Sequence, residues 1–419
     1  MTGSSVLSSW ATIFLAIVVL MTAAYAVIML LFALGLRRLS GNRKVRHPVW
    51  ASVSVIVPAR NEAGVLPWAL GSLMKQDYPG HWEVVVVDDR SDDNSPAVLA
   101  VLAERYPNLR VIRIDECHGA SPKKHALARG IAESSGDIVV TTDADCQYST
   151  MWLQGLVSHM TEDVGVVAGL TIFDLPDYHR VPAWQKIQWL DFFVQNFLAA
   201  GALGWHHAAS CNGSNLCFRR KVYNDILGYG KSADVVSGDD VLFAQRVAAH
   251  SDWKMIFATT PETIVRSLPV GSIRELMHQR LRWASKGLTY RGSMLAFLFA
   301  IYGYYCALLA LPIASLFVPD LLLPTALIWG SKLAVDTVLI VTGAKIFGQQ
   351  RLLPYFLPYE LLHVAFTPYF GFAGLLLPYH WKGDWYRTAT LPKALSGRWI
   401  RLREAQLATK AESEVFEKQ

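Results

Sequence analysis

The chain has 419 residues, enough for two or three domains. Hydrophobic residues make up 52% of it and mean hydropathy is positive, which is too apolar for an ordinary soluble enzyme. The net charge of +5 is small for this length, and no basic block is interleaved with aromatic residues, so we expect no nucleic-acid partner. Five scattered cysteines without a CxxC pair predict reduced thiols facing a cytosolic compartment.

The first predicted element is an uncharged run from Trp10 to Leu36, longer than the roughly 20 residues that cross a bilayer. A cleaved signal peptide is the alternative, but it would need a basic residue before a shorter apolar core. We therefore expect a retained membrane helix. Basic residues follow it directly, which predicts that its C-terminal end faces the cytosol: Arg37, Arg38, Arg43, Lys44 and Arg46.

From Ala51 onward short runs rich in Val and Ile alternate with helical stretches, which predicts a Rossmann-like α/β domain with a mostly parallel sheet. Ligands on such a sheet bind at the C-terminal ends of the strands. The expected strands are Val53–Val57, Glu83–Val87, Arg110–Ile114 and Asp137–Thr142. The expected helices between them are Glu62–Gln76, Asp93–Arg105 and Pro122–Ser134.

Two amphipathic helices close this domain. Residues 183–205 are rich in Trp and Phe and suit a helix in the membrane interface, although a core helix of the soluble domain is the alternative. Residues 272–290 begin with Ser272 and Glu275 in a capping-box pattern. Gln279, Arg282 and Trp283 lie on this second helix.

After Gly292 the chain becomes apolar again. Residues 293–319 carry no charge, and residues 321–344 carry Lys332 and Asp336 at a spacing that pairs them on one helix face. Residues 352–380 contain four prolines, and a third crossing would leave the basic tail outside the cytosol. We therefore expect this last segment to re-enter or lie along the interface.

These patterns predict four regions. They are 1–50, a membrane helix and basic linker; 51–292, the catalytic domain; 293–380, membrane segments; and 381–419, a basic cytosolic tail. The whole is expected to be a multi-pass protein of the cell membrane with its catalytic domain in the cytosol.

Carboxylates follow two predicted strands. Asp143 and Asp145 come directly after the fourth strand, where two carboxylates can hold a divalent cation together with substrate phosphates. Asp88 and Asp89 end the second strand, where they can accept hydrogen bonds from a nucleoside, and the acids after them suit capping of the next helix. A solvated turn is the alternative for each pair.

Two further motifs lie at helix starts. Lys123 opens the third helix, where a cation reinforces anion binding by backbone amides, although a solvated lysine is equally ordinary there. Asp239 and Asp240 precede an apolar run and would stabilise a helix start in any case. If one of them also accepts a proton from an attacking hydroxyl, it is a general base. Arg282 can stabilise charge on a departing diphosphate.

One further pair, Glu360 and His363, has the spacing of half a carboxylate-bridged metal site. No second half exists in the sequence, so we interpret it as a polar pair inside the membrane region.

Together the motifs resemble the family-2 glycosyltransferases, in particular the membrane-embedded group with ceramide glucosyltransferases and cellulose and hyaluronan synthases. The resemblance runs from Val53 to Trp283. It implies a GT-A fold flanked by transmembrane helices, a nucleotide-sugar donor, a divalent cation (Mg²⁺ or Mn²⁺) and inversion at the anomeric carbon. Asp240 would be the catalytic base beside Asp239, and Asp145 with Asp143 would hold the metal. Donor-binding positions would be Pro58, Glu62, Asp88, Asp89, Lys123, Asp143, Gln279, Arg282 and Trp283.

The chain departs from the family pattern at three places. Ala128 replaces the asparagine of the stretch that begins at Lys123, which weakens the assignment of that lysine. The acid before Asp240, often glutamate, is Asp239. Near the C-terminus the family's W-[KR]-G-R is Trp-Lys-Gly-Asp at residues 381–384, and no role is assigned to it.

The resemblance implies transfer of a sugar, with UDP as the nucleotide, to a hydroxyl of a membrane lipid. Two other functions stay open. A processive polysaccharide synthase would act on a glycan acceptor and needs a channel of several packed helices, for which the expected segments are few. A catalytically inactive membrane scaffold would be expected to have lost at least one matched acid, whereas all of them are present.

Overall fold

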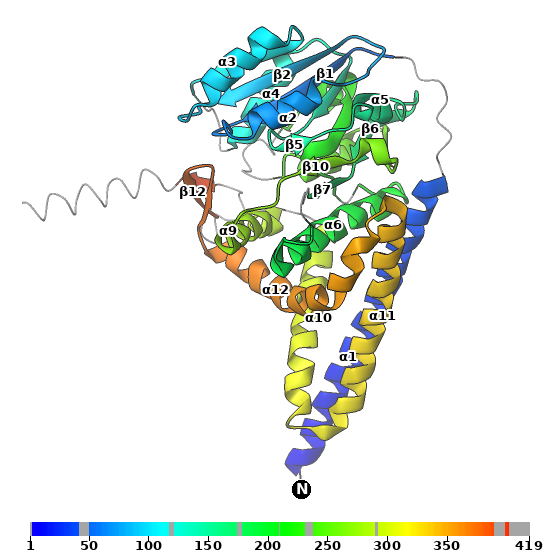
Figure 1. The fold of residues 1–419 in the computed structure, drawn as a ribbon. Helices are drawn as coiled ribbons and strands as arrows, with labels where there is room; N and C mark the ends of the chain where they lie inside the picture. Colours follow the sequence, from blue (N-terminus) through cyan, green and yellow to red (C-terminus); the bar gives the residue numbers. More distant parts are fainter. Residues whose placement is uncertain are drawn as a thin grey trace, which may run out of the picture.

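The computed structural model describes residues 2–41, 50–116, 121–173, 178–208, 210–230, 238–289, 292–388 and 399–401. An α/β domain stands at one end of a stalk of three long helices, and shorter helices lie between the two (Figure 1). The N-terminus lies at the far end of the stalk. Three of the basic residues used above to orient the first helix lie outside the described residues: Arg43, Lys44 and Arg46.

A seven-stranded sheet in the order β3-β2-β1-β4-β8-β6-β9 forms the centre of the domain. All neighbouring pairs are parallel except those of β8, which is antiparallel to β4 and β6. Parallel strands with both faces covered read as continuous apolar runs, and β1 and β2 are buried along almost their whole length. The strands are β1 Val53–Ala59, β2 Trp82–Asp89, β3 Leu109–Ile114, β4 Ile138–Thr141, β6 Val164–Gly169, β8 Leu216–Arg219 and β9 Lys254–Ala258.

Successive residues of β1 and β2 contribute to two different cores, because side chains alternate across a strand. The helices begin where proline is tolerated: α2, α3 and α4 each carry Pro in the first two positions. For this reason α2 starts at Leu66, later than the Glu62 expected from the sequence. The domain's helices are α2 Leu66–Leu73, α3 Ser95–Arg105, α4 Pro122–Glu133, α5 Trp152–Val157, α7 Arg220–Asp225 and α8 Val241–His250.

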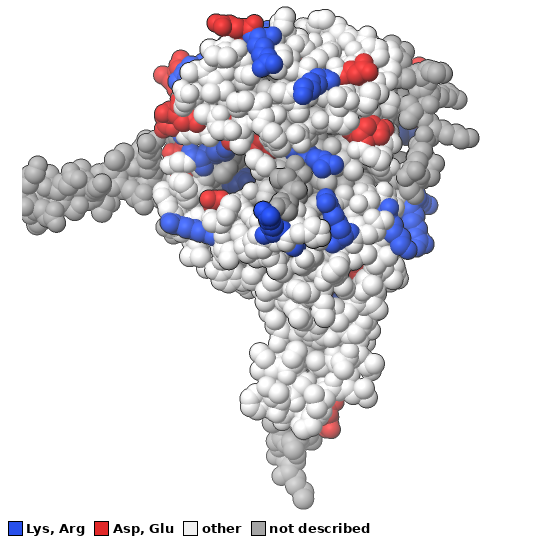
Figure 2. Space-filling view, viewed as in Figure 1, with Lys and Arg blue, Asp and Glu red and all other residues white. Residues whose placement is uncertain are grey.

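The stalk consists of α1 (Thr2–Gly41), α10 (Gly292–Ser315) and α11 (Leu322–Phe347). Three helices among the described residues are long and apolar enough to cross a membrane, with candidate spans at Ala11–Leu39, Met294–Ser315 and Pro319–Phe347. Figure 2 shows a stalk surface almost free of charge below a domain that carries Lys and Arg along its lower part. This distribution indicates membrane association.

Charged groups inside the stalk are paired. Lys332 donates to Asp336 (2.7 Å) and forms an ion pair with Glu360, and the hydroxyl of Tyr25 donates to Asp336 (2.8 Å). His363, whose pairing with Glu360 was considered above, has its Nδ1 3.3 Å from the hydroxyl of Tyr305. The polar residues of these segments therefore join α1, α10, α11 and α12.

Three helices form a layer between stalk and domain: α6 (Ala183–Leu203), α9 (Ile273–Ala284) and α12 (Phe356–Leu376). α12 runs across the stalk rather than along it (Figure 1), and it is not among the candidate spans. Its outer face exposes large apolar side chains such as Leu361, Phe366 and Phe372. Such a face suits a helix that lies in the membrane interface.

Two small sheets complete the fold. β5 (Cys146–Gln147), β10 (Val265–Ser267) and β7 (Thr171–Phe173) form one; β11 (Tyr379–Trp381), β12 (Asp384–Thr388) and β13 (Trp399–Arg401) form the other. β11 and β12 make a tight hairpin after α12, with Lys382 and Gly383 at its turn in positive-φ conformations. The boundary expected between residues 380 and 381 falls within β11.

Candidate active site

A cavity of about 820 Å³ lies at the C-terminal edge of the sheet. Strands β1, β2 and β4 lead into one wall of this cavity, and helices α6 and α9 form another. Its volume falls in the range of sites for small molecules and cofactors. All but one of the site residues predicted from the sequence line it. Asp88 is the exception.

Asp143 and Asp145 project into the cavity from the loop after β4. The carboxylate of Asp145 accepts a hydrogen bond from Ser267 of β10 (3.3 Å). Burial, followed by the nearby carboxylates of Asp143 and Glu62, raises the pKa of Asp145 to about 6. A bound cation would favour the ionised form of Asp145, which has these two carboxylates as neighbours.

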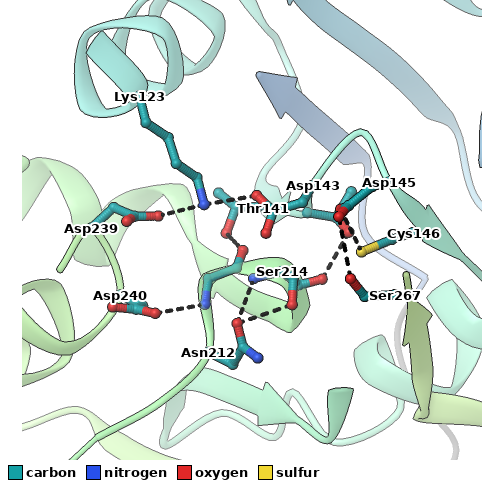
Figure 3. A network of polar contacts seen from close by, with 12 residues as sticks. Lys123, Thr141, Asp143, Asp145, Cys146, Asn212, Ser214, Asp239, Asp240 and Ser267 are labelled. Carbon is teal, nitrogen blue, oxygen red and sulfur yellow. Dashed lines mark hydrogen bonds and ion pairs between the residues drawn. The ribbon is translucent and has the colours of Figure 1, made fainter. Parts of the chain in front are cut away.

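Lys123 stands at the centre of the site (Figure 3). Its ammonium lies 2.7 Å from Asp143 and 3.0 Å from Asp239, so that it joins the loop after β4 to the acids before α8. Burial alone would lower the pKa of Lys123, but the carboxylates of Asp143 and Asp239 raise it above the ordinary lysine value. The lysine is therefore a fixed cation between the two acidic motifs.

Asp239 and Asp240 reach the cavity because of the glycines around them. Gly238 adopts φ +81°, a conformation that favours glycine, and it turns the chain into α8. Gly213 comes so close that a Cβ there would lie 2.8 Å from the carboxylate of Asp239. Its N–H donates to Asp240 (3.1 Å), whose other oxygen accepts from the N–H of Val241 (2.6 Å).

Asp240 therefore caps α8 and lines the cavity at the same time. A carboxylate has about four acceptor positions, and two backbone N–H groups leave room for a hydroxyl group. Burial would raise the pKa of Asp239, but the ammonium groups of Lys123 and Lys124 lower it overall. Of the two acids, only Asp239 contacts the ammonium of Lys123, which leaves Asp240 as the acid available to an incoming hydroxyl.

Helix α9 presents Gln279, Arg282 and Trp283 to the cavity. The side chain of Ser272 caps it by accepting from the N–H of Glu275 (3.2 Å), as the sequence pattern predicts. The Glu275 carboxylate accepts from Gly271, one residue before the cap. The side-chain carbonyl oxygen of Gln279 is buried and accepts no hydrogen bond from any described residue, so it is free to receive one from a ligand.

Arg282 is buried in the cavity wall, and burial lowers its pKa against the opposing effects of Tyr379 and the site carboxylates. Its guanidinium lies 5.0 Å from the ring centroid of Trp381. Trp283 lies between the guanidinium of Arg280 (4.4 Å from its centroid) and the ring of Phe192 on α6 (6.0 Å). The side of the cavity next to α6 is therefore aromatic.

The residues predicted to bind the nucleoside do not all line the cavity. Pro58, Glu62 and Asp89 line the cavity, with Asp89 held by Arg90 (2.7 Å). Asp88 is buried outside the cavity wall, where it pairs with Arg113 (2.9 Å) and accepts from the N–H of Ser91 (3.2 Å). Asp88 therefore supports the loop after β2 rather than facing a ligand.

The β11–β12 hairpin is a part of the wall to which the sequence assigned no role. Lys382 forms an ion pair with Glu62, and the buried Asp384 pairs with Arg60 (3.1 Å). Since Arg60 and Glu62 follow β1, the two pairs fasten the C-terminal hairpin to the side of the cavity next to β1. The Trp-Lys-Gly-Asp stretch was the signal that could have indicated this position.

The metal expected from the sequence can be tested against these side chains. No group of three or more His, Cys, Asp or Glu side chains in the described part of the chain is arranged to hold a metal ion. Asp143 and Asp145 nevertheless offer the oxygen ligands that Mg²⁺ or Mn²⁺ prefers, in a cluster of carboxylates that raises the pKa of Asp145. Asp143 and Asp145 would therefore be the residues that hold a divalent cation.

Comparison with known proteins identifies the domain. The profile described as "Glycosyl transferase family 2" matches residues 54–227, which include the loops after β1, β2 and β4. The chain contains a family-2 glycosyltransferase domain. The GT-A fold class expected from the sequence is thereby confirmed, as is the mostly parallel sheet next to apolar helices.

Relatives of this family-2 domain carry different names. A beta-monoglucosyldiacylglycerol synthase of Synechocystis is 29% identical over 245 residues, which cover 57% of this chain and 48% of the synthase. The chain thus matches about half the length of that protein. An N-acetylglucosaminyltransferase of Rhizobium meliloti is 29% identical over 309 residues, which cover 69% and 68% of the two chains.

Among solved structures, a mannosyltransferase from Pyrobaculum calidifontis in complex with GDP-Man and Mn²⁺ superposes with a TM-score of 0.54. The superposition covers 80% of this chain and 98% of the mannosyltransferase at 23% identity. At this identity the likeness concerns the fold of the family-2 domain alone.

Proposed function

We propose that the protein is a membrane-bound inverting glycosyltransferase that moves a sugar from a UDP-sugar to a hydroxyl group of a lipid. The observation that carries the proposal is the cavity itself. It joins the carboxylates and Lys123 at the sheet edge to the helices α6 and α9 that adjoin the stalk. There a water-soluble nucleotide-sugar donor can meet a lipid acceptor that stays in the membrane.

In the proposed reaction the hydroxyl of the acceptor attacks the anomeric carbon of the donor sugar in a single displacement. Asp240 accepts the hydroxyl proton, held in place by the N–H groups of Gly213 and Val241. A new C–O bond forms as the bond to the nucleoside diphosphate breaks, and the electron pair leaves with the diphosphate. One displacement without a covalent intermediate inverts the anomeric carbon.

The leaving diphosphate needs positive charge in its surroundings. Arg282 and Lys123 supply two fixed cations that require no rearrangement as the charge develops. A divalent cation held by Asp143 and Asp145, when bound, would add Lewis-acid charge on the phosphate oxygens. Glu62 and Asp89 bind the nucleoside in this proposal, and Gln279 directs its unpaired carbonyl oxygen to a hydroxyl of the sugar or acceptor.

A lipid acceptor is supported by the wall next to α6. Phe173 and Phe192 stack at 4.6 Å there, and Trp283 continues the aromatic surface. The interior of the stalk also favours a single transfer over export of a polymer, because buried charges and tyrosines fill it: Tyr25, Tyr304, Tyr305, Lys332, Asp336 and Glu360. A processive synthase would need a polar passage in that position.

The test is to incubate membranes that contain the protein with labelled UDP-sugars and to separate the lipid extract from insoluble polymer. Label in the lipid extract supports the proposal. Label in polymer would favour the polysaccharide synthase instead. Donor turnover in purified protein excludes the third possibility, an inactive scaffold.

A further inference from the structure

Outside the cavity, a largely buried lysine has no acidic partner among the described residues. Lys186 lies in the first turn of α6 and is only 7% exposed. Among the described residues, none accepts a hydrogen bond from its ammonium or forms an ion pair with it, and the next acid on the helix, Asp191, is paired with Arg280. No described residue therefore takes up the N–H donors of this ammonium, and an anion can accept hydrogen bonds from them.

Aromatic rings surround this ammonium. It lies 4.7 Å from the ring centroid of Tyr178 and 5.4 Å from that of Tyr355. Cation–π contacts of this kind stabilise a partly desolvated cation, but a ring does not replace a hydrogen-bond acceptor for its N–H groups. The ring of Tyr355 comes from the segment between α11 and α12, so the lysine lies where α6 meets that segment.

A second cation shares these rings. The guanidinium of Arg351 lies 5.5 Å from the centroid of Tyr178 and 4.3 Å from that of Trp189. The indole N–H of Trp189 is buried, and no described residue accepts a hydrogen bond from it. A hydrogen bond from the hydroxyl of Tyr178 to the backbone carbonyl oxygen of Arg351 (2.6 Å) holds the two residues together.

The position of the cluster along the chain indicates which anion is available. Arg351 follows the end of a candidate membrane span, Pro319–Phe347, by four residues. Beyond the other end of α6, the indole N–H of Trp205 donates to the carbonyl oxygen of Leu31 in α1 (2.7 Å). The cluster therefore lies just beyond the end of a candidate span, at the depth expected of lipid headgroups.

We propose that Lys186 and Arg351, held by the rings of Tyr178, Trp189 and Tyr355, bind the phosphate of an anionic phospholipid headgroup. The ligand fills the unused donors of Lys186 with charge-assisted hydrogen bonds, and its acyl chains extend along the apolar surface of the stalk. The site is separate from the catalytic cavity and does not depend on the reaction proposed above.

The test compares the full-length protein in nanodiscs of phosphatidylcholine alone and of phosphatidylcholine mixed with phosphatidylglycerol. Native mass spectrometry counts the phosphatidylglycerol that stays bound, and thermal unfolding reports its effect on stability. Variants are Lys186→Met and Lys186→Arg. Lys345→Met is the matched control, because Lys345 is an exposed basic residue in the last turn of α11.

We expect Lys186→Met to weaken phosphatidylglycerol binding about tenfold or more, as the loss of a hydrogen bond between charged groups implies. Lys186→Arg and Lys345→Met should bind nearly as the unmodified protein does. In phosphatidylcholine alone, Lys186→Met should unfold at nearly the same temperature, because no described residue forms an ion pair with Lys186. Phosphatidylglycerol should raise the unfolding temperature of the unmodified protein and not that of Lys186→Met.

Three results would overturn the proposal. If Lys186→Met lowers the unfolding temperature equally in both lipids, the lysine is only a structural cation over aromatic rings. If Lys345→Met loses the lipid to the same extent, the attraction is a diffuse property of the basic surface. If inorganic phosphate in phosphatidylcholine nanodiscs stabilises the protein as much as phosphatidylglycerol does, the site takes a soluble anion instead of a lipid.

Discussion

The replacement Lys123→Met removes the cation that joins the two acidic motifs. The ammonium contacts Asp143 at 2.7 Å and Asp239 at 3.0 Å, and the three side chains are 22%, 34% and 13% exposed. Breaking a fully buried ion pair costs about 3–5 kcal/mol. Because Asp143 is partly exposed, solvent screens its ion pair with Lys123. We therefore expect the unfolding free energy to fall by roughly 2–3 kcal/mol. For a domain of this size that lowers the unfolding temperature by roughly 5–10 °C.

The same replacement should slow transfer by about 10²–10³, the usual effect of losing one group that stabilises charge in the transition state. It should also change the response to metal. Without the ammonium, Asp143 and Asp239 repel each other, and Mn²⁺ can compensate for the missing charge. Added Mn²⁺ should therefore raise the unfolding temperature of Lys123→Met more than that of the unmodified protein.

The assay is thermal unfolding with and without Mn²⁺, together with initial rates of transfer from a labelled donor. Lys221→Met is the control, because Lys221 forms an exposed pair with Asp225 and its loss should cost under about 0.5 kcal/mol. Stability and rate equal to those of the unmodified protein in Lys123→Met would refute the bridging role of Lys123. Equal stabilisation of both proteins by Mn²⁺ would refute the competition between the ammonium and the metal for Asp143.

Four other substitutions have defined outcomes. Asp145→Asn, or removal of metal by a chelator, should reduce the rate of transfer by about 10² or more. The measurement is the initial rate against the concentration of free Mn²⁺, and undiminished rates would count against a metal at this residue. Asp384→Asn should lower the unfolding temperature, since it leaves Arg60 buried without its counter-ion, and Lys382→Met should change the KM for the donor more than the unfolding temperature. Lys332→Met should destabilise the stalk by about 3–5 kcal/mol in detergent unfolding assays, because Asp336 and Glu360 lose their partner. No change in stability would mean that these groups are not ionised.

Much of the fold follows from local pattern. Runs such as Val53–Val57 and Glu83–Val87 are apolar apart from Ser54 and Glu83, because parallel strands are covered on both faces, and their positions could be predicted within one or two residues. The short strands β5, β7 and β10 could not be predicted in this way. They have two or three residues each, and only partners from distant parts of the chain define them.

The site residues differ in the same way, because some could be predicted from local pattern and others could not. Asp143 and Asp145 could be placed at the sheet edge because they directly follow a strand, and Ser272 could be recognised as a cap from its spacing to Glu275. The pairing of Lys382 with Glu62 spans 320 residues, and no local pattern encodes it. From the sequence, Asp88 and Asp89 were both predicted to bind the nucleoside. In the structure Asp88 pairs with Arg113 on the neighbouring strand and does not line the cavity.

The most direct test of the proposed function uses Asp240→Asn in nanodiscs with a labelled UDP-sugar and membrane lipid. We predict that the unmodified protein puts label into the lipid extract and that Asp240→Asn binds UDP with similar affinity but transfers no label, because the amide cannot accept the hydroxyl proton. Transfer by Asp240→Asn at a rate comparable to that of the unmodified protein would contradict the role of Asp240 as base. Label found only in insoluble polymer would contradict the lipid acceptor.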